Sequence, residues 1–371
     1  MTGTGIRRVW FVATDPDRLG GVSSFITVLG RALAGRGYEI RLLGVEQPRG
    51  NYPLIRPADW QQTVLFPTQA ERDADPELDA HAYGLERFAA VKADWGPEDL
   101  IICCHVWPME IMIAGGLNPR DRTGPVIIGQ YHGSFHAAES GRDLRRIKKI
   151  FKDVDQFCCL TEADTVSYRR AGLNNVIAMP NPVPLNDARD GDRDKVVVSL
   201  GRYSPEKSLD HLIKAWRTVT ERHPDWRLRL YGAGPKEPLL RELIDRLGLG
   251  DVVTLDGIAA DVGGVLARSS LHAMSSQTEG LPISIIEAAM AGVPTVTYDS
   301  SPGIRAIVRD GATGRIVPKN DVDALAAAFG ELIEDADLRT RLGSAARAEA
   351  EQYAPEPIAD RWEDLMRTAL R

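Results

Sequence analysis

Residues 275–294 read SSQTEGLPISIIEAAMAGVP and lie between two apolar runs. The run before them, Ser270 to Met274, predicts a buried strand, and the run after them, Thr295 to Tyr298, predicts the next strand. The apolar residues that follow the Gly-Leu-Pro turn predict a short helix, which ends at Gly292. A strand, a turn, a helix and a second strand in this order indicate parallel strands joined by a crossover.

The start of this helix offers unpaired backbone donors. Pro282 suits the first turn, because its missing N–H would have no partner there. The N–H groups of the neighbouring residues are then free and point in one direction, and the helix dipole adds positive potential. The sequence therefore predicts a phosphate site formed by Gly280, Leu281, Ile283 and Ser284.

Two carboxylates flank the predicted phosphate site, Glu279 in the turn and Glu287 inside the helix. Glu279 alone is compatible with a charge that favours the helix dipole, and Glu287 alone with a solvated helix face. Glu287, however, lies in an apolar run, where a carboxylate must be paired or reach a ligand. Because carboxylates accept hydrogen bonds from sugar hydroxyls, the arrangement predicts a nucleotide-sugar site.

This stretch resembles the signature of the family 4 retaining glycosyltransferases, in which two glutamates are separated by seven residues. In that family the first glutamate holds hydroxyls of the donor sugar and the second holds the ribose, roles that fall on Glu279 and Glu287. The resemblance implies an α/β protein of the GT-B architecture, in which two Rossmann-like domains with parallel sheets face each other across a cleft. The donor is then expected on the second domain and the acceptor on the first.

The chain has 371 residues, which is long enough for two domains. Two prolines and a polar run, Asn186 to Asp194, follow Asn181 and mark a boundary. We predict an acceptor-side domain at 1–184 and a nucleotide-sugar-binding domain at 185–355. The resemblance implies that a last helix, 356–371, packs back on the first domain.

The composition excludes several classes of protein. The net charge of −7 gives no indication of nucleic-acid binding, and no run approaches the roughly 18 apolar residues of a membrane span. The N-terminal residues lack the apolar region of a signal peptide, so we expect a cytoplasmic protein. The adjacent pairs Cys103-Cys104 and Cys158-Cys159 lie in apolar, strand-like runs and are expected to be buried, reduced thiols.

Alternating strand and helix patterns in the first half favour a parallel sheet with helices on both faces. Gly20 and Gly21 follow the first strand and are compatible with simple turn chemistry, or with close approach of a ligand to a backbone without Cβ. His132 follows the strand that ends at Tyr131; a lone histidine is usually structural, but this position suits a ligand. The resemblance implies that both glycines face the donor diphosphate and sugar, and that His132 lies near the transferred sugar.

A second candidate phosphate site lies at residues 201–208, between a predicted strand and a predicted helix. Arg202 offers a forked donor and Lys207 a point charge, and the alternative is that both side chains are solvated. The resemblance assigns both cations to the donor diphosphate through a Gly-Arg…Lys-Gly motif, in which Ser208 stands in place of the usual second glycine.

Four other segments carry expectations of their own. Gly232, in a Gly-Ala-Gly-Pro turn, is placed near the nucleotide by the resemblance, which also sets the nucleobase against the backbone near Ile258. The segment Gln47 to Pro76 is rich in Pro, Asp and Gln, and we predict that it is irregular. The run Asp310 to Arg315 predicts a tight hairpin turn.

Arg142 to Lys152 predicts a basic amphipathic helix, with Leu144, Ile147 and Phe151 facing inward. Its cations form a solvated face or, alternatively, a docking patch for an anionic acceptor or an anionic membrane surface. Contact with a membrane would place the protein peripherally at the inner membrane face.

Transfer of a glycosyl group from a nucleotide sugar builds negative charge on the leaving phosphate, so catalysis needs positive charge there. Arg202 and Lys207 supply it without a metal, and we expect no metal and no cofactor other than the donor substrate. Together with His132 and Glu279 they are the predicted catalytic residues. Retention of anomeric configuration is implied by the resemblance alone.

The function we predict is transfer of a hexose, of glucose or N-acetylglucosamine type, from a UDP-sugar to a hydroxyl acceptor. UDP is preferred over GDP because Tyr298 to Gly303 and Leu160 to Asp164 most resemble the branch that modifies teichoic acids and similar polymers. The sequence does not name the acceptor, and a polymer, a lipid-linked precursor and a natural product stay open. Alternatives are a GDP-mannose-type transferase acting on a lipid or a natural product, a UDP-sugar epimerase and a two-lobed binding protein.

Overall fold

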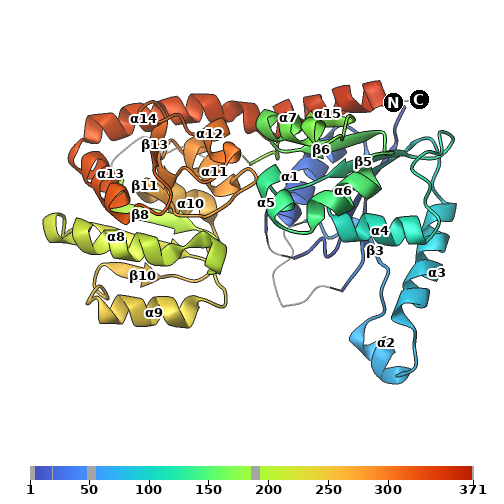
Figure 1. Cartoon of the computed structure of the whole chain (residues 1–371), viewed down its shortest axis with the longest axis horizontal. Coiled ribbons are helices and arrows are strands. Elements are labelled where there is room, and N and C mark those ends of the chain that lie inside the picture. The colour runs from blue at the N-terminus through green and yellow to red at the C-terminus, as the bar shows by residue number, and fades with distance from the viewer. Residues whose placement is uncertain (1–4, 19, 48–55, 185–192, 370–371) are drawn as a thin grey trace. The chain divides into compact units, whose positions relative to one another are not determined.

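The computed structural model describes residues 5–18, 20–47, 56–184 and 193–369, and the chain divides into two units. Unit 1 comprises Met1–Pro182 together with Pro355–Arg371, and unit 2 comprises Val183–Ala354 (Figure 1). The boundaries predicted from the sequence lie after residues 184 and 355. Each unit contains a sheet and hydrophobic cores of its own.

The described part of unit 1 contains a seven-stranded sheet whose neighbouring strands all run parallel. Its strands are β1 (Arg8–Ala13), β2 (Glu39–Gly44), β3 (Gln61–Val64), β4 (Asp99–Cys103), β5 (Val126–Gln130), β6 (Gln156–Cys159) and β7 (Val176–Ala178). The order is β3-β2-β1-β4-β5-β6-β7, so the chain builds outward from β1 and then crosses back to β4. The carboxyl ends of β1 and β4 form a topological switch point, where open α/β sheets bind ligands.

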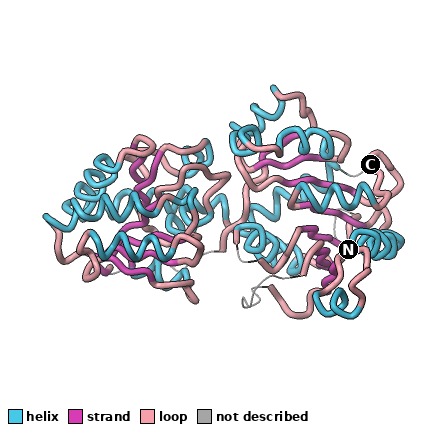
Figure 2. Tube along the Cα trace, turned by 60° about the horizontal axis from the view of Figure 1, so that its bottom comes forward, coloured by secondary structure: helices cyan, strands magenta, loops and turns pink. Residues whose placement is uncertain are grey.

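Helices cover both faces of this sheet, and Figure 2 shows the magenta strands between cyan helices. The helices of unit 1 are α1 (Gly21–Gly35), α2 (Gln69–Ala74), α3 (Ala80–Ala93), α4 (Val106–Ala114), α5 (Phe135–Ser140), α6 (Asp143–Phe151), α7 (Glu162–Arg170) and α15 (Pro355–Ala369). Helix α2 buries no residue and does not cover the sheet.

Successive residues of β1 enter two different cores, because strand side chains point alternately to opposite faces. Val9 and Phe11 pack in the core that also holds residues of α1 and α15, whereas Val12 packs in the core beneath α4, α6 and α7. Trp362 of α15 is fully buried in the first of these cores, and its ring centroid lies 6.1 Å from that of Phe25 in α1. The last helix therefore belongs to unit 1.

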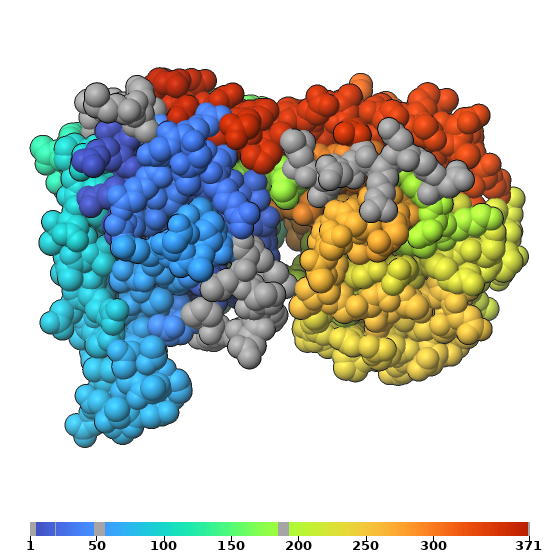
Figure 3. Space-filling view, turned by 180° about the vertical axis from the view of Figure 1, so that it is seen from behind, coloured from blue at the N-terminus to red at the C-terminus, as the bar shows by residue number. Residues whose placement is uncertain are grey.

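The segment from Gln47 to Pro76 is not irregular throughout, and this prediction is wrong for the part that the structure describes. It contains the edge strand β3, which pairs with β2, and the helix α2, which begins with a capping box between Thr68 and Glu71. Neither element carries an apolar pattern, since no residue of α2 is buried and β3 is half-buried. Figure 3 shows α2 projecting from unit 1. Residues 48–55 lie outside the described part.

Unit 2 repeats this plan with a six-stranded parallel sheet of order β10-β9-β8-β11-β12-β13 in its described residues. Its strands are β8 (Asp194–Leu200), β9 (Arg227–Tyr231), β10 (Val253–Leu255), β11 (Ser269–Met274), β12 (Thr295–Tyr298) and β13 (Gly314–Val317). Its helices are α8 (Leu209–Arg222), α9 (Glu237–Arg246), α10 (Val262–Arg268), α11 (Ile283–Met290), α12 (Pro302–Ile307), α13 (Val322–Glu334) and α14 (Ala336–Ala350), with 3-10 turns η1 (Pro205–Lys207) and η2 (Glu351–Tyr353).

The strand order of unit 2 reverses between β8 and β11, which makes their carboxyl ends a second topological switch point. The loop after β8 carries Arg202 and Lys207, and the loop after β11 carries Glu279. The fold therefore brings to one edge two motifs that lie 72 positions apart in the sequence.

The turn predicted at Asp310–Arg315 is present, but it does not close a hairpin. The N–H of Gly311 donates to the carbonyl of Gly314 at 2.9 Å. The strand that follows, β13, pairs parallel with β12 rather than antiparallel with a strand directly before the turn. The turn signal was thus right about the local bend and wrong about the strand pairing.

Among the described residues, no helix combines the length and the apolar character needed to cross a membrane.

Candidate functional site

Lys207 and Glu279 meet at the switch point of unit 2. The Lys207 Nζ atom lies 2.6 Å from Glu279 Oε1, and the two side chains are 23% and 13% exposed. Their loops are joined by further bonds, because the Ser275 hydroxyl donates to the carbonyls of Lys207 and Ser208 at 2.9 Å each. A cation and a carboxylate are therefore held at fixed positions beside the carboxyl ends of β8 and β11.

Arg202 lies in the same loop but is more exposed than Lys207. Its guanidinium forms an ion pair with Glu206 at 2.9 Å, and its side chain is 62% exposed. Burial acts to raise the pKa of Glu206, but the hydrogen bond from Ser204 and two nearby cations outweigh it, so this pKa lies below its ordinary value. The loop thus presents two cations, each next to its own carboxylate.

The start of α11 presents free backbone donors. Within the helix the first donors are Ile285 and Ile286, whose N–H groups bond to the Pro282 carbonyl at 3.2 and 3.4 Å. No hydrogen bond in the described part of the chain uses the N–H groups of the four residues named for the phosphate site: Gly280, Leu281, Ile283 and Ser284. Such a row of amides at a helix N-terminus attracts anions.

The loop before α11 rests directly on the start of α12. A Cβ atom added to Gly303 would lie 1.8 Å from the Gly280 carbonyl oxygen, so only glycine allows this approach. Four side-chain hydroxyls at these strand ends are buried and have no hydrogen-bond partner among the residues that the structure describes: Ser276 and Thr278 after β11, and Ser300 and Ser301 after β12. Sequence reasoning missed these hydroxyls. Their positions at the carboxyl ends of β11 and β12 were the signal that could have found them.

Glu287 lies inside α11 among buried apolar neighbours. Burial raises the pKa of this carboxyl from 4.5 to about 7. With such a pKa, the carboxyl is protonated in part of the molecules and ionised in the others near neutral pH. It can therefore donate a hydrogen bond in the first form and accept one in either form.

Gly232 and Ile258 occupy the loops after β9 and β10. A Cβ atom on Gly232, whose φ is 149°, would lie 1.8 Å from the Gly201 carbonyl oxygen, and its N–H donates to the Gly257 carbonyl at 2.7 Å. The loops after β8, β9 and β10 are therefore in backbone contact. Ile258 is 49% exposed and offers an apolar surface next to this junction.

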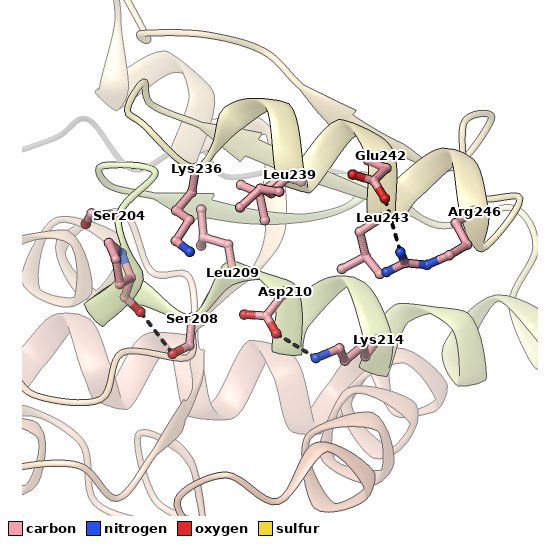
Figure 4. A pocket seen from close by; sticks show the side chains of 12 residues that line it. Ser204, Ser208, Leu209, Asp210, Lys214, Lys236, Leu239, Glu242, Leu243 and Arg246 are labelled. Atoms are coloured by element: carbon pink, nitrogen blue, oxygen red, sulfur yellow. Dashed lines mark hydrogen bonds and ion pairs between the residues drawn. The ribbon is translucent and has the colours of Figure 1, made fainter.

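A groove of about 370 Å³ lies between α8 and α9. Figure 4 shows Lys236, Leu239 and Arg246 on one side facing Leu209 and Lys214 on the other. The groove touches the loop of Arg202 and Lys207 through Ser204 and Ser208, but it contains none of the predicted site residues. It is a feature separate from the switch point.

In unit 1, the predicted glycines lie at the start of α1. The Gly20 carbonyl accepts the N–H of Ser24 at 3.1 Å and the hydroxyl of Ser23 at 2.9 Å. A Cβ atom on Gly20 would meet no heavy atom within 4 Å, so the space on that side is open. The glycines are thus placed at the switch point between β1 and β4.

His132 follows β5 at the same edge of the unit 1 sheet. Both its ring nitrogens are buried and form no hydrogen bond among the described residues, and its ring centroid lies 4.9 Å from that of Phe25 in α1. Burial lowers the pKa of His132 to about 3, so the imidazole is neutral at physiological pH. Gln130 Oε1 and Asn181 Oδ1 are likewise buried and unpaired, two polar atoms that the sequence did not single out.

A family model described as "Glycosyl transferases group 1" matches residues 186–349. This match covers the motifs of unit 2 that carry Arg202, Lys207 and Glu279.

Two curated relatives match part of the chain. The exopolysaccharide phosphotransferase SCO2592 of Streptomyces coelicolor is 39% identical over 190 residues, which are 51% of this chain and 20% of that protein. An uncharacterized glycosyltransferase of Haemophilus influenzae is 30% identical over 216 residues, 57% of this chain and 61% of that protein. The chain therefore spans less than two thirds of the length of either relative.

A solved structure similar over almost the whole chain is that of a TarM variant from S. aureus, in complex with fondaparinux, alpha-GlcNAc-glycerol and UDP. It aligns with a TM-score of 0.83 at 15% identity, covering 97% of this chain and 100% of the other. At this identity the similarity shows the fold alone. The predicted fold class, α/β with two Rossmann-like domains of the GT-B type, is confirmed.

Proposed function

We propose that this protein is a hexosyltransferase using a nucleotide-sugar donor and a hydroxyl acceptor, and the match of residues 186–349 to the family model of group 1 glycosyl transferases supports this proposal. The observation that carries the proposal is the Lys207–Glu279 pair, 2.6 Å apart beside the free amides of α11. A cation, a row of N–H donors and a carboxylate are the groups that a pyrophosphate joined to a sugar requires.

Each residue of unit 2 then has a role in the proposed reaction. Lys207 and Arg202 neutralise the negative charge that develops on the leaving diphosphate, and electrostatic stabilisation of this kind often contributes more to catalysis than any other effect. Glu279 accepts hydrogen bonds from hydroxyls of the transferred sugar and orients Lys207. Glu287 binds the ribose, and Gly232 and Ile258 contact the nucleotide. In unit 1, Gly20, Gly21 and His132 contribute to the sugar and acceptor side.

We propose UDP as the nucleotide. Support comes from the TarM variant, which binds UDP and shares the fold, and from the resemblance of residues 160–164 and 298–303 to the teichoic-acid branch. The transferred sugar is of glucose or N-acetylglucosamine type, and the configuration at the anomeric carbon is retained. The proposed reaction needs no metal, because the cations of unit 2 supply the positive charge.

The test is nucleotide release from a panel of UDP- and GDP-sugars, with and without hydroxyl acceptors, in the presence of a chelator. We expect UDP release that depends on an acceptor and persists with the chelator. Turnover of a UDP-sugar without any acceptor would instead favour an epimerase, and release of GDP only would favour the GDP-mannose-type alternative.

A further inference from the structure

Five exposed cations lie on one side of helix α6 and its two flanking residues. At 3.6 residues per turn, they fall within an arc of about 120° that contains no acidic residue. Arg142 precedes the helix and Lys152 follows it, so the arc runs for about 15 Å. Its members, which we call the α6 arc, are Arg142, Arg145, Lys148, Lys149 and Lys152.

Most of the charge of the α6 arc has no ion-pair partner among the described residues. Arg146, which lies outside the arc, forms ion pairs with Glu110 at 2.7 Å and with Asp143 at 2.9 Å. Asp153 lies closer to Arg120, at 3.1 Å, than to Lys152, at 4.0 Å. No ion pair in the described part of the chain includes the other four members of the arc. Three carboxylates near α6 are thus paired with arginines outside the arc: Glu110, Asp143 and Asp153.

This local charge contrasts with the whole chain, whose net charge is −7. An anionic partner would be repelled by most of the molecule and attracted here, so the arc defines where such a partner approaches. An exposed carboxylate, Glu139, lies in the preceding helix α5 and forms an ion pair with none of these arginines.

Helix α6 is not a helix that inserts into a membrane, because the apolar residues on its opposite side are already buried. Ile147, Ile150 and Phe151 are buried in the core of unit 1, so they cannot enter a bilayer. Stable membrane attachment takes an apolar anchor in addition to charge, and none of the large exposed apolar residues of the described chain lies on α6. What remains is a surface that recognises charge alone.

We propose that the α6 arc binds a linear polymer that carries phosphate groups, and that this polymer is the acceptor of the proposed transfer. The second half of this statement rests on the proposed function. The start of α6 lies beside the carboxyl end of β5, because the hydroxyl of Tyr131, the residue directly before His132, donates to Asp143 Oδ2 of α6 at 3.3 Å. A chain bound along the arc is therefore directed toward that strand end.

The first experiment measures binding without any donor. A fluorescently labelled poly(glycerol phosphate) chain is titrated with the full-length protein at several salt concentrations. Replacing Lys148 and Lys149 together by glutamine should weaken binding about tenfold at low salt and reduce the slope of log K against log salt by between about one and two. The matched control replaces Arg341 and Arg347, two exposed cations of α14, by glutamine and should bind like the wild type.

The second experiment measures transfer to the same polymer. The Lys148→Gln/Lys149→Gln variant should raise KM for the polymer about tenfold at low salt with little change in kcat, and its donor hydrolysis in the absence of acceptor should equal that of the wild type. Equal melting temperatures of the variants exclude a folding defect.

The proposal is overturned if the wild type does not bind the polymer, or if the α6 variant and its control bind it equally well. Capture by phosphatidylglycerol vesicles that depends on Lys148 and Lys149, without polymer binding, would replace the polymer by a membrane surface. The protein could bind the polymer through the arc and yet turn over no nucleotide sugar. That result would support the arc as a binding surface, but it would refute both the proposed function and the assignment of the polymer as its acceptor.

Discussion

The ion pair of Lys207 and Glu279 is the residue-scale feature on which the proposed chemistry depends. Its side chains are mostly buried, at 23% and 13% exposure, and its partners come from loops after two different strands. Removing one member of such a pair leaves the other charge without compensation. The pair therefore stabilises the local structure and, in the proposed function, also binds the diphosphate.

We expect Lys207→Ala to lower kcat/KM for the UDP-sugar by about 10²- to 10³-fold, because a charge at the leaving phosphate is lost. Lys207→Arg should recover part of the activity. The matched control is Lys214→Ala, since Lys214 forms an ion pair of the same 2.6 Å length with Asp210 but at an exposed position of α8. Equal activities of the Lys207→Ala and Lys214→Ala variants would contradict the assignment.

Glu287 makes the stability of unit 2 depend on pH. Its pKa rises from 4.5 to about 7 on folding because burial disfavours the ionised form. The folded state then holds a proton that the unfolded state releases, so stability is fully present below pH 4.5 and falls as pH rises toward 7. The loss approaches about 3 kcal/mol once the pH exceeds both pKa values.

The measurement is the free energy of unfolding in urea between pH 4.5 and 8 for the wild type and for Glu287→Gln. Glutamine resembles the protonated carboxyl and does not ionise, so the variant should lack this fall and become the more stable protein at pH 8. Glu242→Gln, at a side chain 67% exposed, serves as the control and should follow the wild type. Parallel pH curves for the wild type and Glu287→Gln would refute the shift.

At the scale of elements, the turn from β8 into α8 depends on an unusual backbone conformation. Ser208 has φ 45° and ψ 43°, a left-handed conformation that L-residues other than glycine rarely adopt. The family motif has glycine at this place, and the serine adopts the conformation that glycine prefers. The serine therefore forms the turn with strain in its backbone.

Ser208→Gly should raise the free energy of unfolding by up to about 1 kcal/mol, because the relief of strain exceeds the added freedom of the unfolded chain. Ser208→Val should lower it, since a β-branched residue is disfavoured at positive φ. The control is Ser204→Gly in the same loop, where φ is −129° and glycine brings no relief. A Ser208→Gly variant less stable than the wild type would show that the strain is absent.

Helix α15 is the element that returns the end of the chain to unit 1. Trp362→Ala should destabilise unit 1 by about 3–5 kcal/mol, because the side chain is fully buried in its core. Asp364→Ala, on the exposed side of the same helix at 74% exposure, should change stability little. Urea unfolding of both variants checks this, and equal effects would mean that α15 does not pack as described.

At the scale of the whole molecule, two units with separate cores predict separate unfolding events. We expect calorimetry to show a transition that Trp362→Ala lowers and another that UDP raises. A ligand at a hundredfold excess over its Kd stabilises its unit by about 2.7 kcal/mol. Stabilisation by UDP of the transition that Trp362→Ala lowers would place the nucleotide on unit 1 and contradict the proposed donor site.

Local patterns were enough to predict much of the fold and to select the candidate site residues, whose roles stay predictions. Apolar runs separated by glycine turns predicted parallel sheets with crossover helices, and the Pro282 turn predicted free amides, because both follow from backbone geometry within a few residues. The edge strand β3 and the exposed helix α2 were not predicted, because neither buries enough apolar surface to give a periodic pattern in the sequence.

The other features of the candidate site could not be predicted from local patterns, because they depend on packing between residues far apart in the sequence. The contact of Lys207 with Glu279 spans 72 positions and exists because the strand order reverses between β8 and β11. The raised pKa of Glu287, the neutral His132 and the largely unpaired charge of the α6 arc depend on which groups surround each side chain. Burial and pairing are properties of the assembled units, so no reading of neighbouring residues along the chain contains them.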